Sequence, residues 1–215
     1  MTYDIAIIGG GIIGAAAFYK IQKAYPDLKM LLIEKEKGLA DHQTGNNSGV
    51  IHSGLYYKPG SSKAKYCVEG RHELVAFAKE HGVDHDVCGK VVVATSEKDL
   101  PFMDQIFENG IANNTEGLKK ITAEEIKDYE PDVVGIAGIW VPCTGIIDYR
   151  QATEKMVEVS LKLQPKSKML LGTEAKVFHH EEGQTVIETT KGTFAAKNLV
   201  FCGGFLDRWR AAALN

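Results

Sequence analysis

The stretch Asp4-Ile-Ala-Ile-Ile-Gly-Gly-Gly-Ile-Ile-Gly14 decides the fold that we expect for this chain. After its aspartate, the run is apolar and mostly β-branched without alternation, which is typical of a parallel strand buried on both faces. Glycines follow at once, and residues 12–25 are expected to form a helix that Pro26 ends. Residues 29–34 then give a second buried strand. Together these elements predict a right-handed βαβ unit.

The glycines between the first strand and its helix have the spacing G-x-G-x-x-G, formed by Gly9, Gly11 and Gly14. The first permits a tight turn, the second lets the backbone approach a pyrophosphate, and the third lets the helix pack closely on the strand. The helix amino terminus favours negative charge. Glu34, at the end of the second strand, can accept hydrogen bonds from a ribose diol and disfavours a 2′-phosphate. The motif predicts a dinucleotide site but does not separate FAD from NAD, and a tight turn in an unrelated α/β protein is the structural alternative.

Local signals predict the remaining elements. Ser61 or Ser62 and Thr122 with Glu125 are expected to cap helices, and Gly82 to end one. The expected helices cover residues 61–81, 97–109, 122–130 and 148–163. The expected strands cover residues 91–94, 135–141, 168–171, 175–180, 185–190, 193–196 and 198–202. The four strands between residues 168 and 196 are expected to form a small β-meander.

Bulk composition excludes several classes of protein. Hydrophobic residues make up 44% of the 215 residues and charged residues 25%, which is typical of a folded globular chain. The net charge of −3 gives no broad positive field for a nucleic acid. The four cysteines are scattered without metal-ligand spacing, so we expect reduced thiols and no metal. Neither a signal peptide nor a membrane-spanning helix is expected.

The segment Thr44-Gly-Asn-Asn-Ser-Gly-Val-Ile-His-Ser-Gly-Leu-Tyr-Tyr57 belongs to a long irregular stretch that is more typical of a functional loop than of an idle one. It combines small residues, amide side chains and backbone donors directly after the expected ribose-binding strand. An NAD site needs no such loop. FAD, with a ribityl chain and an isoalloxazine ring, must be held over a greater length, so the loop favours FAD.

With the glycine motif, this loop resembles the FAD-binding start of the D-amino-acid-oxidase-like flavoproteins, and most of all that of the L-2-hydroxyglutarate dehydrogenase/oxidase family. The resemblance continues to the end of the chain in the following segments: Pro59–Gly70, Cys88-Gly-Lys90, Glu130-Pro131, Thr144–Gln151, Val200–Gly204 and Asp207-Arg208. It implies an α/β fold, namely a Rossmann-like FAD-binding domain with a β-meander and an inserted, incomplete α+β substrate domain. On this basis we expect residues 1–82 and 143–215 to form the discontinuous FAD-binding domain, and residues 83–142 to form part of the substrate domain.

The motifs and the resemblance together give a set of expected site residues. Those expected to hold non-covalent FAD are Gly9, Gly11, Gly14, Glu34, Lys35, Thr44, Asn46, Asn47, Ser48, Gly49, Val50, Val177, Cys202 and Gly203. Val177 is carried over from the family as a backbone contact to the adenine. The resemblance also implies oxidation of L-2-hydroxyglutarate to 2-oxoglutarate, with the cofactor doing the redox chemistry.

His52, at the end of the loop, is the candidate catalytic residue, either as a base or as a hydrogen-bonding partner of the cofactor. Tyr56 and Tyr57 are candidates for substrate binding, although aromatic residues after such a loop more often serve packing. Arg150 is interpreted as a local salt-bridge or solvated residue near Asp148. Cys67, Cys88 and Cys143 are interpreted as lacking the basic neighbours that would mark a reactive thiolate, so burial is preferred over reactivity.

Three other functions stay open on the sequence. One is an FAD-dependent amino-acid or glycerol-3-phosphate oxidoreductase, and another is a catalytically incomplete FAD-binding fragment, because the family's chains continue well beyond residue 215. The third is an NAD-binding regulatory module. The expected partners are a small 2-hydroxy acid and either quinone or oxygen as electron acceptor. The expected location is the cytoplasm, with possible peripheral contact to the inner membrane.

Overall fold

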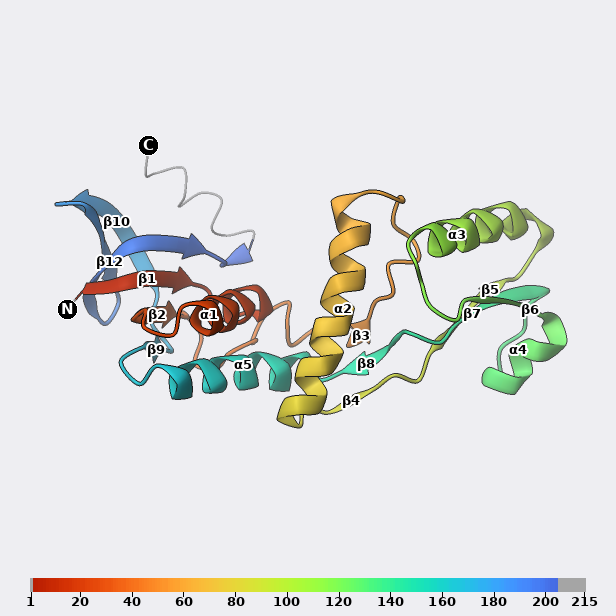
Figure 1. The fold of residues 1–215 in the computed structure, drawn as a ribbon, viewed down its shortest axis with the longest axis horizontal. Helices are drawn as coiled ribbons and strands as arrows, with labels where there is room; N and C mark the ends of the chain where they lie inside the picture. The colour runs from red at the N-terminus through yellow and green to blue at the C-terminus, as the bar shows by residue number, and fades with distance from the viewer. Residues whose placement is uncertain (1, 205–215) are drawn as a thin grey trace. The chain divides into compact units, whose positions relative to one another are not determined.

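The computed structural model describes residues 2–204, which form two compact units (Figure 1). Of the described residues, the first unit contains 2–48 and 149–204, and the second contains Gly49–Asp148. The part of the resemblance at Asp207-Arg208 lies outside the described residues. The family resemblance predicts a division by function, into an FAD-binding domain and a substrate domain with boundaries at residues 82 and 143. This division stays a prediction.

A six-stranded sheet with the order β10-β11-β12-β1-β2-β9 forms the centre of the first unit. Strands β12, β1, β2 and β9 run parallel to one another. Strands β10, β11 and β12 form an antiparallel meander. The strands are β1 (Thr2–Ile8), β2 (Met30–Ile33), β9 (Lys168–Leu170), β10 (Ala175–Glu181), β11 (Gln184–Thr189) and β12 (Gly192–Phe201). β2 is buried along its whole length, as a continuous apolar run requires. The predicted βαβ unit is therefore present.

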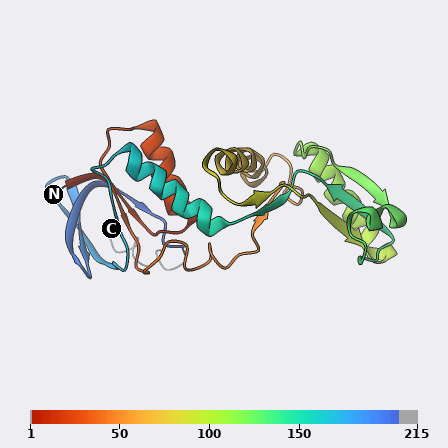
Figure 2. The same ribbon diagram turned by 90° about the horizontal axis from the view of Figure 1, so that it is seen from below.

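Two helices of the first unit, α1 (Ile12–Ala24) and α5 (Tyr149–Leu163), lie side by side (Figure 2). A polar contact fixes the far end of α1 to the chain that follows α5. Gln22 is fully buried, and its amide accepts a hydrogen bond from the hydroxyl of Ser167 at 3.0 Å. The same hydroxyl accepts from the backbone N–H of Met30, the first residue of β2, at 2.9 Å. A buried polar group is stable only when paired in this way.

Two strand predictions were wrong. Residues 168–171 do not belong to the meander, because β9 pairs in parallel with β2 at the opposite edge of the sheet. Residues 193–196 and 198–202 form one strand, β12, instead of two. Its first half pairs with β11 and its second half with β1, so one long strand joins the meander to the parallel strands. Such pairing between distant segments leaves no local signal in the sequence.

Two three-stranded sheets and three helices make up the second unit. The sheet β3-β8-β4 contains Val50–Ile51, Gly145–Ile147 and His85–Asp86, and the sheet β5-β7-β6 contains Lys90–Ala94, Ala137–Val141 and Lys119–Thr122. The helices are α2 (Ser62–His81), α3 (Leu100–Ala112) and α4 (Ala123–Tyr129). Strands β3, β4, β6 and β8 were not predicted, since each has four residues or fewer and carries no alternating pattern.

The predicted helix caps of this unit are present. The Ser61 hydroxyl accepts from the N–H of Ala64, and Gly82 ends α2 in the left-handed conformation at φ +69°. Thr122 and Glu125 form a reciprocal capping box at α4. The helix expected over residues 97–109 was placed too early, because residues 97–99 form a 3₁₀ turn and α3 continues to Ala112.

Within residues 2–204, no helix has the length and apolar character needed to cross a membrane.

Candidate cofactor site

The turn between β1 and α1 requires glycine at two of its three motif positions. Gly9 has a φ of +112°, and a Cβ there would lie 2.7 Å from the carbonyl carbon of Cys202 at the end of β12. At Gly14, a Cβ would lie 1.9 Å from the carbonyl oxygen of Gly9. These approaches are closer than any side chain tolerates, so the turn and the helix can come together only around glycine.

The amino terminus of α1 is arranged to receive an anion. Its N-cap residue, Gly11, has extended backbone geometry and no side chain to cap the helix, and the first turn carries no acidic residue. The hydroxyl of Thr44 accepts a hydrogen bond from the N–H of Ile12 at 3.0 Å. The helix dipole and the N–H groups of this first turn favour a phosphate here.

Glu34 follows β2 and is held in place by the backbone on both sides. One carboxylate oxygen accepts from the N–H of Gly10 at 2.5 Å, and the other accepts from the N–H of Glu36 at 2.8 Å. These bonds fix the carboxylate beside the glycine turn. Each oxygen retains capacity for a further donor, such as a ribose hydroxyl.

These groups line one cleft of about 1100 Å³, formed by residues of the first unit alone. A cleft of this size accommodates a large ligand. The expected cofactor residues that line it are Gly9, Gly11, Glu34, Lys35, Thr44, Asn47, Cys202 and Gly203. The ends of three parallel strands, β1, β2 and β12, therefore meet at the cleft, as ligand sites of open α/β sheets require.

Other expected cofactor residues lie elsewhere. Gly14 is buried against Gly9, as described above, and Asn46 donates its side-chain N–H groups to the carbonyls of Asp41 and His42. Val177 lies on β10 with 47% of its surface exposed and does not line the cleft. Ser48 ends the first unit, and Gly49 and Val50 belong to the second unit.

Sequence reasoning missed the segment after β9. Residues 172–175 line the cleft, with Thr190 of the neighbouring turn. The N–H of Gly172 donates to the carbonyl of Glu36 at 2.6 Å, and that of Thr173 donates to the carbonyl of Glu34 at 2.8 Å. The only local signal was Gly172, which has a φ of +58°. The parallel pairing of β9 with β2 decides its place, and that pairing was not predicted.

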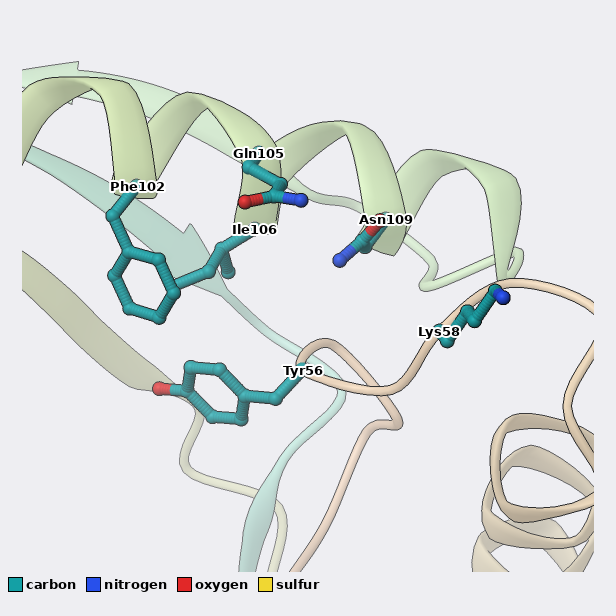
Figure 3. Close-up of a pocket in the computed structure, with 6 residues that line it drawn as sticks. All are labelled: Tyr56, Lys58, Phe102, Gln105, Ile106 and Asn109. Carbon is teal, nitrogen blue, oxygen red and sulfur yellow. The ribbon is translucent and has the colours of Figure 1, made fainter.

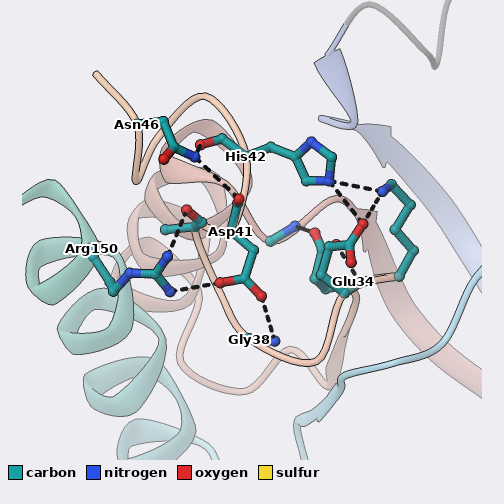
Figure 4. A network of polar contacts seen from close by, with 10 residues as sticks. Glu34, Gly38, Asp41, His42, Asn46 and Arg150 are labelled. Atoms are coloured by element: carbon teal, nitrogen blue, oxygen red, sulfur yellow. Dashed lines mark hydrogen bonds and ion pairs between the residues drawn. The ribbon is translucent and has the colours of Figure 1, made fainter. Parts of the chain in front are cut away.

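A charged group lies at one side of the cleft. Lys35 and His42 both contact the carboxylate of Glu36, and the imidazole Nε2 of His42 is 2.8 Å from it (Figure 4). The hydrogen bonds from Lys35 and His42 lower the pKa of Glu36. All three side chains line the cleft, and His42 and Glu36 were not among the predicted site residues.

Arg150, near the start of α5, holds the loop that follows β2 (Figure 4). Its guanidinium donates to the carbonyl of Leu39 and to the carboxylate of Asp41, both at 2.8 Å. The same carboxylate accepts from the N–H of Gly38 at 3.0 Å. The sequence predicted a salt bridge of Arg150 within its own helix or a solvated charge. The ion pair instead joins Arg150 to Asp41, which is 109 positions away in the chain. Arg150 thus shapes the loop that carries Thr44.

His52 lies in the second unit, where burial lowers its pKa, with a smaller contribution from the charge of Lys90. The thiol of Cys67 donates to the backbone carbonyl of His52 at 3.4 Å. Burial was wrongly expected for Cys88, which is exposed. The expected lack of basic neighbours was wrong for Cys143, on which the charge of Arg71 acts, and for Cys67, on which the charges of Arg71 and Lys90 act. Burial is the larger effect and raises the pKa of this thiol, so the preference for an unreactive thiol stands.

The two candidate substrate-binding tyrosines have different surroundings. Tyr56 lines a pocket of about 410 Å³, where its ring lies opposite Phe102 and Ile106 of α3 (Figure 3). The backbone carbonyl of Tyr57 accepts from the side chain of Asn113 at 2.8 Å, which fixes the turn. Burial raises the pKa of Tyr56. Tyr56 is therefore open to a ligand on one side, whereas Tyr57 contributes to the turn through its backbone.

The sequence profile of a family described as FAD dependent oxidoreductase matches residues 4–214. The chain belongs to this family. L-2-hydroxyglutarate dehydrogenase from Indibacter alkaliphilus is 45% identical over 204 residues, which are 95% of this chain and 51% of that protein. The enzyme of that name from Escherichia coli K12 is 38% identical over 95% of this chain and 48% of its own length. The chain thus spans about half the length of the curated relatives it matches.

Solved structures of oxidases share the fold. An L-α-glycerophosphate oxidase from Mycoplasma pneumoniae, solved with FAD bound, has a TM-score of 0.90 at 26% identity, over 100% of this chain and 57% of that one. A glycine oxidase from Geobacillus kaustophilus has a TM-score of 0.87 at 21% identity, over 98% and 58% of the two chains. These likenesses confirm the predicted Rossmann-like fold class, and family membership confirms FAD as the expected cofactor.

Proposed function

We propose that this chain provides the FAD-binding part of an enzyme that oxidises L-2-hydroxyglutarate, or a similar 2-hydroxy acid, to the 2-oxo acid. The observation that supports this substrate is the 45% identity to L-2-hydroxyglutarate dehydrogenase over 95% of the chain. The cleft of the first unit supports the cofactor, since it combines a glycine turn, a helix amino terminus and a fixed carboxylate. An NAD-binding regulatory module would account for the turn but not for this likeness.

In this proposal, FAD is held without a covalent bond. The turn at Gly9 and Gly11 and the first N–H groups of α1 receive the pyrophosphate, and Glu34 accepts from a ribose. Lys35, Thr44 and Asn47 are proposed to contact other parts of the cofactor, and Cys202 and Gly203 line the cleft next to Gly9. Val177 is proposed to contact the adenine through its backbone, as the family resemblance implies.

Bound in the cleft, FAD would supply the hydride acceptor for oxidation at the alcohol carbon. His52 is proposed to take the hydroxyl proton. Burial lowers its pKa, which keeps the imidazole neutral at neutral pH and hence able to accept a proton. Tyr56 and Tyr57 are proposed to bind substrate in the second unit, which would make that unit part of the substrate domain.

An absorbance titration of the protein, expressed from its full reading frame and loaded with FAD, tests this proposal. Anaerobic L-2-hydroxyglutarate should bleach the flavin band, whereas the D enantiomer should leave it unchanged. If the protein binds flavin but neither enantiomer reduces it, the proposed substrate is refuted, whereas membership of the family is unaffected. Failure to bind FAD at all would refute the proposed cofactor site.

Glycerol 3-phosphate is the substrate to test second, because the Mycoplasma pneumoniae glycerophosphate oxidase has the same fold at 26% identity. Glycine and other amino acids belong in the same panel. The proposed electron acceptor is quinone or oxygen, and the proposed location is the cytoplasm with peripheral membrane contact. Fractionation that leaves the protein wholly soluble, without quinone reduction, would contradict the membrane and quinone part.

A further inference from the structure

Lys90 is the first residue of β5, and its side chain is partly buried within the second unit. Its ammonium nitrogen lies 3.5 Å from the hydroxyl of Tyr56 and 4.6 Å from the centre of the same ring. This contact joins β5 to the segment that follows the glycine-rich loop. A cation over an aromatic face is held electrostatically, so Lys90 has a defined position.

No aspartate or glutamate among residues 2–204 forms an ion pair with Lys90. By contrast, Lys119 and Lys120 in the same unit pair with Glu125 and Asp104. Burial lowers the pKa of Lys90, because an ammonium group loses hydration without gaining a counter-ion. An incoming carboxylate would supply that counter-ion through a charge-assisted hydrogen bond.

Lys90 also acts electrostatically on the candidate base. Its charge contributes to the lowered pKa of His52, after burial, and it acts on the thiol of Cys67. Cys67 in turn donates to the carbonyl of His52 at 3.4 Å. These residues come from three separate segments, namely the loop after β3, helix α2 and strand β5. The second unit therefore holds an ammonium group without a counter-ion whose charge acts on the histidine that we assign to proton transfer.

We propose that Lys90 binds a carboxylate of the 2-hydroxy acid beside His52, and that Tyr56 holds the ammonium group in place. This inference rests on the proposed function and extends it, since sequence patterns had not singled out Lys90 as a site residue. A carboxylate bound there would be fixed while the neighbouring hydroxyl faces the imidazole. Lys90 itself exchanges no proton and transfers no group in this role.

Binding of glutarate tests the inference apart from turnover, because this dicarboxylate lacks the hydroxyl and cannot be oxidised at that carbon. Calorimetry on the FAD-loaded protein, expressed from its full reading frame, should show binding at least about tenfold weaker in Lys90→Gln. Lys90→Arg should retain most of the affinity because it keeps the charge. Lys98→Gln is the matched control, since Lys98 is an exposed lysine of the same unit and should bind glutarate like the wild type.

The KM for L-2-hydroxyglutarate should rise in Lys90→Gln by a similar factor, with FAD content unchanged. If the wild type is reduced by L-2-hydroxyglutarate but Lys90→Gln binds glutarate and substrate normally, the inference is overturned and the function stands. If L-2-hydroxyglutarate does not reduce the flavin of the wild type, the proposed function is refuted. Glutarate binding alone then tests whether Lys90 binds a carboxylate. Selective loss in Lys90→Gln would support the anion site, and equal binding or no binding in both proteins would refute it.

Discussion

At the scale of single residues, the glycine turn is the best-determined part of the cofactor site. Each motif glycine has its own steric environment, and Gly14 has the tightest, since its Cβ position lies 1.9 Å from the carbonyl oxygen of Gly9. A methyl group there cannot be accommodated by a side-chain rotation, because the obstacle is backbone. The helix must move away from the strand instead.

We predict that Gly14→Ala weakens FAD binding by about tenfold or more and destabilises the fold by about 1–3 kcal/mol, as overpacking does. Gly70→Ala is the control, because Gly70 lies within α2 with no atom within 4 Å of its Cβ position. That change should leave FAD affinity unaltered and stabilise the protein by up to about 1 kcal/mol. Urea unfolding and fluorescence titration with FAD measure both effects. Equal FAD affinity in Gly14→Ala and wild type would contradict the steric argument.

At the scale of elements, distant segments are tied together by a few polar side chains. Arg150 of α5 holds the loop after β2, and Asp4 of β1 binds both neighbouring segments. Arg150 binds the loop that follows β2, and Asp4 binds Lys29, directly before β2, and Lys197 of β12. Their contribution is therefore to the position of loops and strand ends and not to the apolar core.

We predict that Arg150→Gln raises the Kd for FAD about three- to tenfold and lowers stability by about 1 kcal/mol, because the loop that carries Thr44 loses its anchor. Lys162→Gln on the same helix removes an exposed ion pair with Glu158 and should leave both stability and FAD affinity close to those of the wild type, because solvent screens such a pair. The two variants are compared by FAD titration and chemical denaturation. An Arg150→Gln protein that matches the Lys162→Gln control would show that the loop keeps its shape unaided.

The lowered pKa of Asp4 predicts that the stability of the fold depends on pH. Hydrogen bonds from the side chain of Lys197 and the backbone N–H of Lys29 lower its pKa below 3.8 in the folded state. The carboxylate therefore contributes stability above pH 3.8, and that contribution is lost as pH falls through the lower folded pKa. Urea unfolding at a series of acidic pH values should show a shallower decline in Asp4→Asn than in wild type. Identical slopes would mean that Asp4 titrates alike in the folded and unfolded chains.

At the scale of the whole molecule, the cleft is built by one compact unit from two distant parts of the chain, before Ser48 and after Tyr149. The second unit contains His52, Tyr56 and Lys90 and contributes nothing to the lining of this cleft. The cleft proposed for the cofactor and the residues proposed to contact substrate thus belong to separate compact parts of the chain.

We predict that FAD at about 100 times its Kd stabilises the protein by about 2.7 kcal/mol. Hydrogen exchange followed by mass spectrometry should show the largest gain in protection in three segments that line the cleft, namely residues 8–13, 33–47 and 172–175. The helices α3 and α4 of the second unit serve as internal controls and should change little. A gain concentrated in those helices would place the cofactor outside the cleft described here.

The sequence by itself determined the βαβ unit, the glycine turn, the acidic residue after β2 and most helix caps. These features depend on contacts within about 35 residues, so spacing and residue type suffice to predict them. Tertiary structure alone decided that β9 lies beside β2, that β12 is one strand, and that residues 172–175 line the cleft. The position of Arg150 against Asp41, 109 positions away, was decided in the same way. Each of these depends on pairing between segments far apart in the chain, for which burial and backbone hydrogen bonding, and not local preference, select the partner.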